Sequence, residues 1–202
     1  MKHHVAVILI CSLAVAGSAL ADDLNPPPWQ RGMDGTTWAA WEFSTPDPKP
    51  MPDAGYLPYG PPDTTVWTGV GQQWWDSWEG RQGVWPLSGA MEMLLFNRPE
   101  PLPYKDIQIQ ITWMPQVPRA EPVVTELMWG GTGELIDEIP LSSDWTHSTY
   151  MIHLEPNPDM ETVWIEGSIM VDEVVIDTIC IPEPMTLSLL ALGALALGRK
   201  RR

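Results

Sequence analysis

Basic residues are scarce in this 202-residue chain. It contains 11 Lys and Arg against 26 Asp and Glu, which gives a formal net charge of −15. Such a negative balance repels phosphate backbones and anionic lipid headgroups, so nucleic acid is excluded as a partner. The same balance favours solubility and the binding of divalent cations.

Motifs that indicate catalysis are also missing. The chain has no Gly-x-Ser-x-Gly and no His-Glu-x-x-His, and Gly69-x-Gly71 lacks the third glycine of a dinucleotide site. The segment Trp75-Asp76-Ser77-Trp78-Glu79 places two carboxylates beside aromatic rings, as in a glycosidase, but a chain this acidic produces such pairs by chance. We therefore expect no enzyme, with a glycoside hydrolase-like activity as the third alternative for function.

The first residues have the pattern of a cleaved signal peptide. Lys2 precedes an apolar run over residues 5–16, and Ala19-Leu20-Ala21 supplies the small residues that signal peptidase requires. We expect cleavage after Ala21, which makes residues 1–21 a signal peptide and residues 22–181 the exported domain. Cys11 leaves with the signal, so Cys180 has no intramolecular disulfide partner, and its strand-like context predicts a buried thiol.

The last residues have three parts: the tripeptide Pro182, Glu183 and Pro184, the apolar residues 185–198, and the basic cluster Arg199, Lys200, Arg201 and Arg202. The order of these parts in residues 182–202 resembles the PEP-CTERM sorting domain. That resemblance implies handling by an exosortase, a membrane protease. The prolines predict that the tripeptide is extended. The apolar residues predict a transmembrane helix, and the basic cluster predicts that the end of this helix lies in the cytoplasm. The apolar part has only 14 residues, whereas a full span needs about 20.

The exported domain is more acidic than the whole chain. Five of the 11 basic residues and one of the 26 acidic residues lie in the two terminal signals, which leaves 6 against 25, or about −19. Its length suits one domain with a real core. Residues 22–62 are rich in proline and glycine, which excludes long helices there, and residues 36–44 are the one segment of that part able to pair as a strand.

Strand patterns dominate the rest of the domain. Residues 107–113 alternate strictly and place Ile107, Ile109, Ile111 and Trp113 on one face, which predicts a half-buried antiparallel strand. Further strands are predicted over residues 91–96, 123–129, 149–154, 162–166 and 169–179, separated by turn-forming residues. No amphipathic helix of convincing length is present. The prediction is an all-β fold, a single β-sandwich.

The last predicted strand changes phase. The apolar residues are at odd positions in Ile169 and Val171 but at even positions in Val174 and Ile176. To keep all four on the inner face, the strand needs one extra residue, which predicts a β-bulge at Asp172-Glu173. Residues 167–176 resemble the closing strand of galactose-binding-like jelly rolls, the fold of many carbohydrate-binding modules. The resemblance implies a jelly-roll sandwich and a structural Ca²⁺ that bridges the first and last strands, for which Glu42 and Asp172 are the counterparts. A loop with Glu155, Asn157, Asp159 and Glu161 is the rival cation site.

Tryptophan is unusually common, with 12 residues against two phenylalanines. Five of the tryptophans lie between Trp67 and Trp85, and most of them are expected in the core. Trp74 and Trp75 are neighbours and would face opposite sides of a strand, so one of them is expected to be exposed. Exposed indoles are platforms for sugar rings, which makes Trp74, Trp75 and Trp78 the candidates for glycan stacking.

These patterns together favour an exported cell-envelope or extracellular-matrix protein without catalysis, associated with extracellular polysaccharide. Its expected route is export across the inner membrane, transient anchoring by the C-terminal helix, and arrival at the cell surface or outside the cell. The alternative is a carbohydrate-binding module. No cofactor other than the candidate Ca²⁺ is expected.

Overall fold

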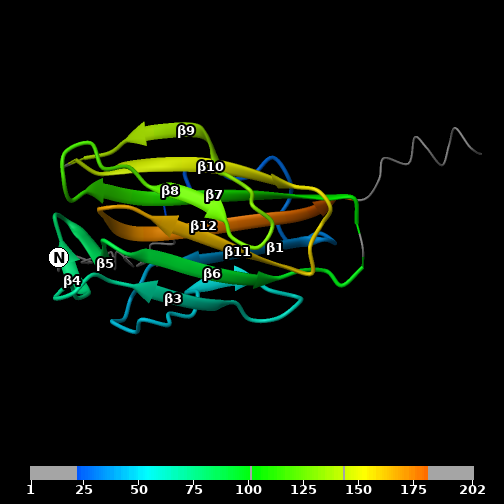
Figure 1. Ribbon diagram of the computed structural model, residues 1–202, viewed down its shortest axis with the longest axis horizontal. Helices are drawn as coiled ribbons and strands as arrows, with labels where there is room; N and C mark the ends of the chain where they lie inside the picture. The colour runs from blue at the N-terminus through cyan, green and yellow to red at the C-terminus, as the bar shows by residue number, and fades with distance from the viewer. Residues whose placement is uncertain (1–21, 101, 143, 182–202) are drawn as a thin grey trace, which may run out of the picture.

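A computed structural model describes residues 22–100, 102–142 and 144–181 of the chain. These residues form twelve β-strands and no helix, in two antiparallel sheets packed face to face (Figure 1). The all-β sandwich that the sequence predicts is therefore confirmed. No helix in this described part is long and apolar enough to cross a membrane. The C-terminal helix predicted over residues 185–198 lies outside the described residues.

The larger sheet has eight strands. Six of them follow the order β2(Ala54–Tyr56), β1(Thr36–Trp41), β12(Ile169–Ile181), β7(Tyr104–Pro115), β10(Thr146–Leu154) and β9(Glu134–Pro140). The other two, β4(Trp75–Trp78) and β5(Arg81–Leu87), form a hairpin joined to the start of β12. The first strand of the domain thus lies beside the last, and the long strands β7 and β12 form the centre of the sheet (Figure 1).

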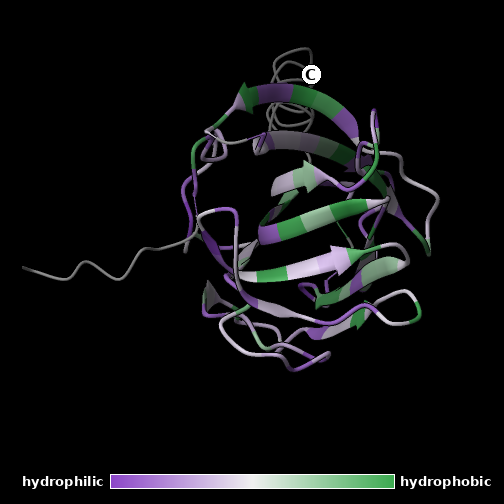
Figure 2. Cartoon of the chain, turned by 90° about the vertical axis from the view of Figure 1, so that its left-hand side faces the viewer, coloured by the Kyte–Doolittle hydropathy of each residue, from purple (hydrophilic) through white to green (hydrophobic). Residues whose placement is uncertain are grey.

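The smaller sheet has four strands in the order β3(Asp63–Trp67), β6(Ala90–Phe96), β11(Met160–Glu166) and β8(Val123–Glu126). Alternate residues of both sheets point inward and form one buried apolar layer, as the period of two in a strand requires. Ile107, Ile109 and Ile111 of β7 meet Met91 and Met93 of β6 in this layer. Figure 2 shows the alternation of hydrophobic and hydrophilic residues along the strands.

Each of the seven segments predicted as strands contains a strand, although the structure ends the strands predicted over residues 36–44 and 123–129 three residues earlier, at Trp41 and Glu126. Five further strands, β2, β3, β4, β5 and β9, were not predicted. β9 is exposed along most of its length and β2 has only three residues, so neither carries an alternating apolar pattern. β5 is buried on both faces after its second residue, and a run of that kind does not alternate.

The predicted bulge in the last strand is confirmed. β12 pairs with β7 in register except between Val171 and Glu173, where Asp172 is the extra residue. The bulge keeps Val171 and Val174 on the same inner face, because both belong to the buried apolar layer. It also turns two successive carboxylates, Asp172 and Glu173, toward the outer side of the sheet.

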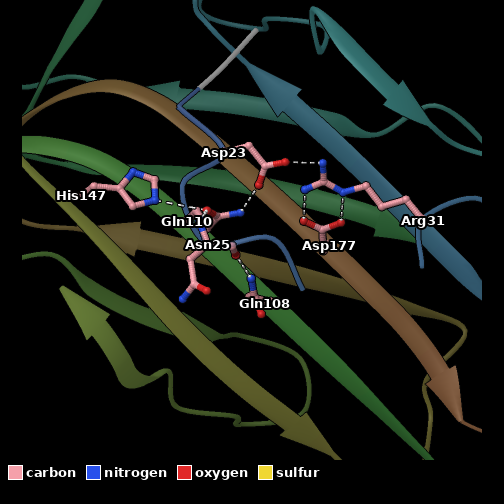
Figure 3. Close-up of polar contacts among 7 residues, drawn as sticks. All are labelled: Asp23, Asn25, Arg31, Gln108, Gln110, His147 and Asp177. Carbon is pink, nitrogen blue, oxygen red and sulfur yellow. Dashed lines mark hydrogen bonds and ion pairs between the residues drawn. The ribbon is translucent and has the colours of Figure 1, made fainter. Parts of the chain in front are cut away.

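The prediction of a half-buried β7 is wrong. Its polar residues Gln108, Gln110 and Thr112 are only 2%, 1% and 0% exposed, so the strand is buried on both faces. The cover on the outer face is the extended segment of residues 22–31, which crosses the larger sheet before β1 begins (Figure 3). Cys180 is a free, buried thiol on β12, as predicted.

Candidate functional site

Loops gather at the end of the sandwich where β4 and β5 form their hairpin (Figure 1). Two open hollows lie there, with volumes of about 800 Å³ and 540 Å³. Trp78, Met114 and Pro115 line both hollows, so the two adjoin and together make up the groove. The larger hollow is completed by the β7–β8 and β9–β10 loops, and the smaller one by residues 71–73 and the start of β12.

An aromatic pair stands between the two hollows. The ring centroids of Trp75 and Trp78 are 5.0 Å apart and the ring planes are tilted by 52°. Glu79 and Gly80, the two residues that join β4 to β5, both have positive φ angles of 45° and 84°. Positive φ at both positions is typical of a two-residue hairpin turn whose twist matches that of the flanking strands. The turn holds the short strand β4, with Trp75 and Trp78, at the rim of the groove.

The adjacent tryptophans have different environments. Trp74 packs against the apolar core, and its Nε1 donates a hydrogen bond to the carbonyl oxygen of Phe43 at 2.9 Å. Trp75 is 39% exposed and lines the smaller hollow. Of the five tryptophans between positions 67 and 85, Trp85 alone is buried, whereas Trp67 is 54% exposed and Trp74 and Trp78 are half-buried. The expectation that most of the five lie in the core is therefore not met. Trp75 and Trp78, rather than Trp74, are therefore placed to contact a ligand.

Charged and polar groups surround the aromatic pair. Glu79, Arg119, Glu121 and Asp144 line the larger hollow and are exposed, while Gln72 and Gln73 line the smaller one. A groove with flat indole faces and a rim of carboxylates, amides and a guanidinium is suited to a polyhydroxylated ligand, because sugar rings offer both an apolar face and many hydroxyls.

A second polar region covers the outer face of the larger sheet (Figure 3). Arg31 binds both carboxylate oxygens of Asp177, with Nε and Nη2 at 2.5 and 2.6 Å, and its Nη1 contacts Asp23 at 2.5 Å. Asp23 also accepts a hydrogen bond of 2.8 Å from Gln110, whose Oε1 accepts one from the backbone nitrogen of Asn25. Residues 22–31 are thus clamped onto β7 and β12 along their length.

Three carboxylates meet where this segment begins. Oxygens of Asp22, Asp172 and Glu173 all lie within 4.8 Å of one another, and Asp172 and Glu173 are only 5% and 6% exposed. Arg81 pairs with Asp22 and, at 3.1 Å, with Asp172. Thr112 donates a hydrogen bond of 3.0 Å to Glu173.

Burial dominates the electrostatics of this cluster. It raises the pKa of Asp172 to about 7, against the opposing effect of Arg81. It raises the pKa of Glu173 to about 8, with further increases from the negative charges of Asp22 and Asp172. Burial of these acidic groups therefore outweighs the charge of Arg81, and Glu173 mostly keeps its proton at neutral pH.

The structure brings together the two residues predicted to hold Ca²⁺. Glu42 and Asp172 line the same small hollow, and the charge of Glu42 contributes to the raised pKa of Asp172. Sequence reasoning missed the other members, Asp22 and Glu173, although the predicted bulge placed Glu173 beside Asp172. Arg81 already lies among these carboxylates, and Ca²⁺ at this place stays a prediction.

The acidic residues of the rival loop, Glu155, Asp159 and Glu161, do not lie close enough together to share an ion. Glu161 is fully buried and its Oε1 lies 2.6 Å from the Nζ of Lys105, so its charge is engaged inside the sandwich. Within the described ranges, Asp22, Asp172 and Glu173 form the one group of three acidic, histidine or cysteine side chains close enough to share an ion.

The two histidines of the domain lie in different environments. His147 is 1% exposed, with Nδ1 2.9 Å from the hydroxyl oxygen of Thr112 and Nε2 3.1 Å from the Oε1 of Gln110. His153 lies at the surface of the same strand and pairs with Asp106 at 2.6 Å.

The residues predicted for processing and sorting lie outside the described part of the chain. They are Ala19 and Ala21 at the expected cleavage site and Pro182, Glu183, Pro184, Arg199, Lys200, Arg201 and Arg202 in the tail. Comparison with known proteins adds no relative: no protein-family model, curated protein or solved structure matches this chain.

Proposed function

We propose that this chain is an exported envelope or matrix protein that associates, without catalysis, with extracellular polysaccharide through the groove around Trp75 and Trp78. The observation that carries the proposal is the position of this aromatic pair, partly exposed between two hollows at a loop-rich end of a rigid sandwich. A carbohydrate-binding module is a second candidate that the same groove supports. It differs in acting on a soluble glycan rather than on a matrix polymer.

The direction of β12 supports a role at a surface. β12 begins beside the groove, where Ile169 pairs with Leu87 and Pro115, and ends at Ile181, where it pairs with Tyr104. Thirteen strand residues separate these ends by about 40 Å. A tail that follows Ile181 and is held at a membrane would leave the groove at the far end of the domain, facing outward.

We propose that the sandwich belongs to the jelly-roll class of the galactose-binding-like domains. In support of this, the first and last strands of the domain are antiparallel neighbours, and the last strand carries a bulge with acidic residues. Many modules of that class bind carbohydrate, which agrees with the proposed role of the groove but does not identify the glycan.

A glycan array with the purified domain tests the binding proposal. Trp75→Ala is expected to weaken binding at least about tenfold, because stacking on an indole is lost, with no change in melting temperature. Trp129→Ala is the matched control, since Trp129 is 53% exposed but hydrogen bonds to Met160, away from the groove. No binding to any polysaccharide would refute the proposal, and turnover of a bound glycan would replace it with a glycoside hydrolase.

Fractionation and intact mass test the sorting proposal. Changing Pro182, Glu183 and Pro184 to alanine, or deleting residues 185–202, is expected to alter both the mass and the destination of the exported protein. A mass and location identical to those of the wild type would contradict sorting by the tail.

A further inference from the structure

We propose that removal of the signal peptide after Ala21 creates an ion pair in the core of the cluster, between the new α-ammonium group of Asp22 and the buried carboxylate of Glu173. The inference rests on the export proposed above and goes beyond it. It assigns to the processing step a role in stabilising the folded domain.

A positive charge near the buried carboxyl groups of the cluster would stabilise their ionised forms. Asp172 and Glu173 are almost fully buried, Asp22 adds a third carboxylate, and Glu42 lines the same hollow. Arg81 is the cation that the described contacts place among them, and it reaches Asp22 and Asp172. The contacts of Glu173 within the described part are with neutral donors, Thr112 and the backbone of Asp22. A buried carboxylate without a cation is costly, so a charge supplied beside Glu173 has a large effect.

The backbone nitrogen of Asp22 already occupies the required position. It donates a hydrogen bond to the carboxylate of Glu173. The bond that signal peptidase is expected to cut, after Ala19-Leu20-Ala21, is the bond to this same nitrogen. Cleavage converts an amide with one proton into an ammonium group with three, without moving the atom.

The clamp of residues 22–31 explains why the new terminus stays in place. Asp23 is held by Arg31 and Gln110, and the backbone of Asn25 bonds to Gln108 and Gln110 (Figure 3). A free chain end normally loses conformational freedom when it forms an ion pair. Here the neighbouring residues have already fixed the terminus, so the pair forms at little additional entropic cost.

The proposal implies that precursor and mature protein differ in stability although their folds are the same. In the precursor the Asp22 nitrogen is uncharged, so the described contacts place no cation beside Glu173, and ionising Glu173 leaves a deficit of positive charge. In the mature protein the deficit is reduced, so the domain reaches its full stability only after the signal peptide has been removed on the outer side of the membrane.

An insertion tests this directly on the full chain expressed with its own signal peptide. Adding Gly-Ser between Ala21 and Asp22 preserves the Ala-x-Ala motif but moves the α-amino group two residues away from Glu173. Denaturant unfolding is compared for the wild type, the insertion, Glu173→Gln and the combination of both. We expect the insertion to lower the folding equilibrium constant about tenfold or more in the wild-type background, and much less in the Glu173→Gln background.

The reactivity of the terminus is a second readout that does not depend on overall stability. The α-amino group of the wild type is expected to react with an amine-acylating reagent more slowly than that of the insertion or of Glu173→Gln, because a proton held in an ion pair removes the nucleophile. Equal rates in all three proteins would overturn the proposal.

The outcomes separate this inference from the export proposal. Intact mass shows where the chain is cut. A cut elsewhere or no cut refutes processing after Ala21 and the ion pair with it. A cut after Ala21 with an insertion that is silent, or equally harmful in both backgrounds, refutes the ion pair alone. Stabilisation by added CaCl₂ that chelator reverses, with a silent insertion, would assign the cluster to a metal ion instead.

Discussion

Lys105 shows at the scale of one residue how this sandwich accommodates a charge. It lies on the inward face of β7, in line with Ile107 and Ile109, and its side chain is completely buried. Its Nζ lies 2.6 Å from Glu161 of the opposite sheet, and it also bonds to Asn97. The pair links the two sheets at the end of the sandwich away from the groove.

Lys105→Met is expected to destabilise the domain by about 3–5 kcal/mol, because Glu161 then remains buried without a cation. Burial already raises the pKa of Glu161, and Lys105 opposes that rise. Urea unfolding followed by tryptophan fluorescence measures the loss. The double variant Lys105→Met with Glu161→Leu is expected to recover most of it, since both polar groups are removed together. A single variant as stable as the wild type would contradict a role for the pair.

The extended segment of residues 22–31 is a structural element of the fold although it is not a strand. It has no ladder hydrogen bonds of its own, yet it buries the polar face of β7 and supplies Asp22 to the carboxylate cluster. Its attachment depends on Arg31, whose partner Asp177 has a completely buried side chain. Burial raises the pKa of Asp177, and the Arg31 guanidinium opposes that rise.

Arg31→Ala is expected to cost about 2–3 kcal/mol and to expose the segment to limited proteolysis, because Asp177 loses its cation and the clamp opens. Lys49→Ala is the matched control. Lys49 pairs with Asp63 at 3.7 Å, but both side chains are more than 60% exposed, so its loss is expected to stay within about 0.5 kcal/mol. Equal effects of the two substitutions would show that the segment does not depend on Arg31.

The carboxylate cluster predicts the pH dependence of the whole molecule. Burial raises the pKa of Asp172 to about 7 and that of Glu173 to about 8, above the ordinary values of 3.8 and 4.5. We expect the same in the Gly-Ser insertion variant, because its Asp22 nitrogen stays an amide. The folded state therefore keeps protons that the unfolded state has already released near neutral pH. Stability contributed by these groups is present at low pH and is lost as the pH rises through 7 and 8.

The insertion variant is expected to lose about 2–4 kcal/mol of unfolding free energy between pH 6.5 and 8.5. His147 offsets only a small part of this loss. Burial lowers its pKa in the folded state, and the unfolded side chain, with an ordinary pKa of about 6.5, releases its proton at the lower edge of the window. Unfolding curves across the window measure the slope, and Glu173→Gln is expected to reduce it. A flat profile would mean that Arg81 keeps the two buried carboxylates ionised throughout, against the charges of Asp22 and Glu42.

Features that depend on local pattern follow from the amino-acid sequence alone. The period of two in residues 107–113 placed Ile107 and Trp113 in a core, and the change of phase after Val171 located the bulge, because both follow from the alternation of side chains along a single strand. The expected processing site and sorting tail are likewise linear signals, to be tested by mass and fractionation.

Tertiary structure alone decided the features that depend on contacts between distant residues. Nothing local to Gln108 and Gln110 indicates that residues 22–31 cover them, and nothing local to Asp22 indicates that it meets Glu173, about 150 positions later in the chain. The choice between Trp74 and Trp75 also depended on Phe43, which accepts the hydrogen bond that fixes Trp74 against the core. Burial and charge clustering are sums over neighbours in space, and a strand pattern records only neighbours in sequence.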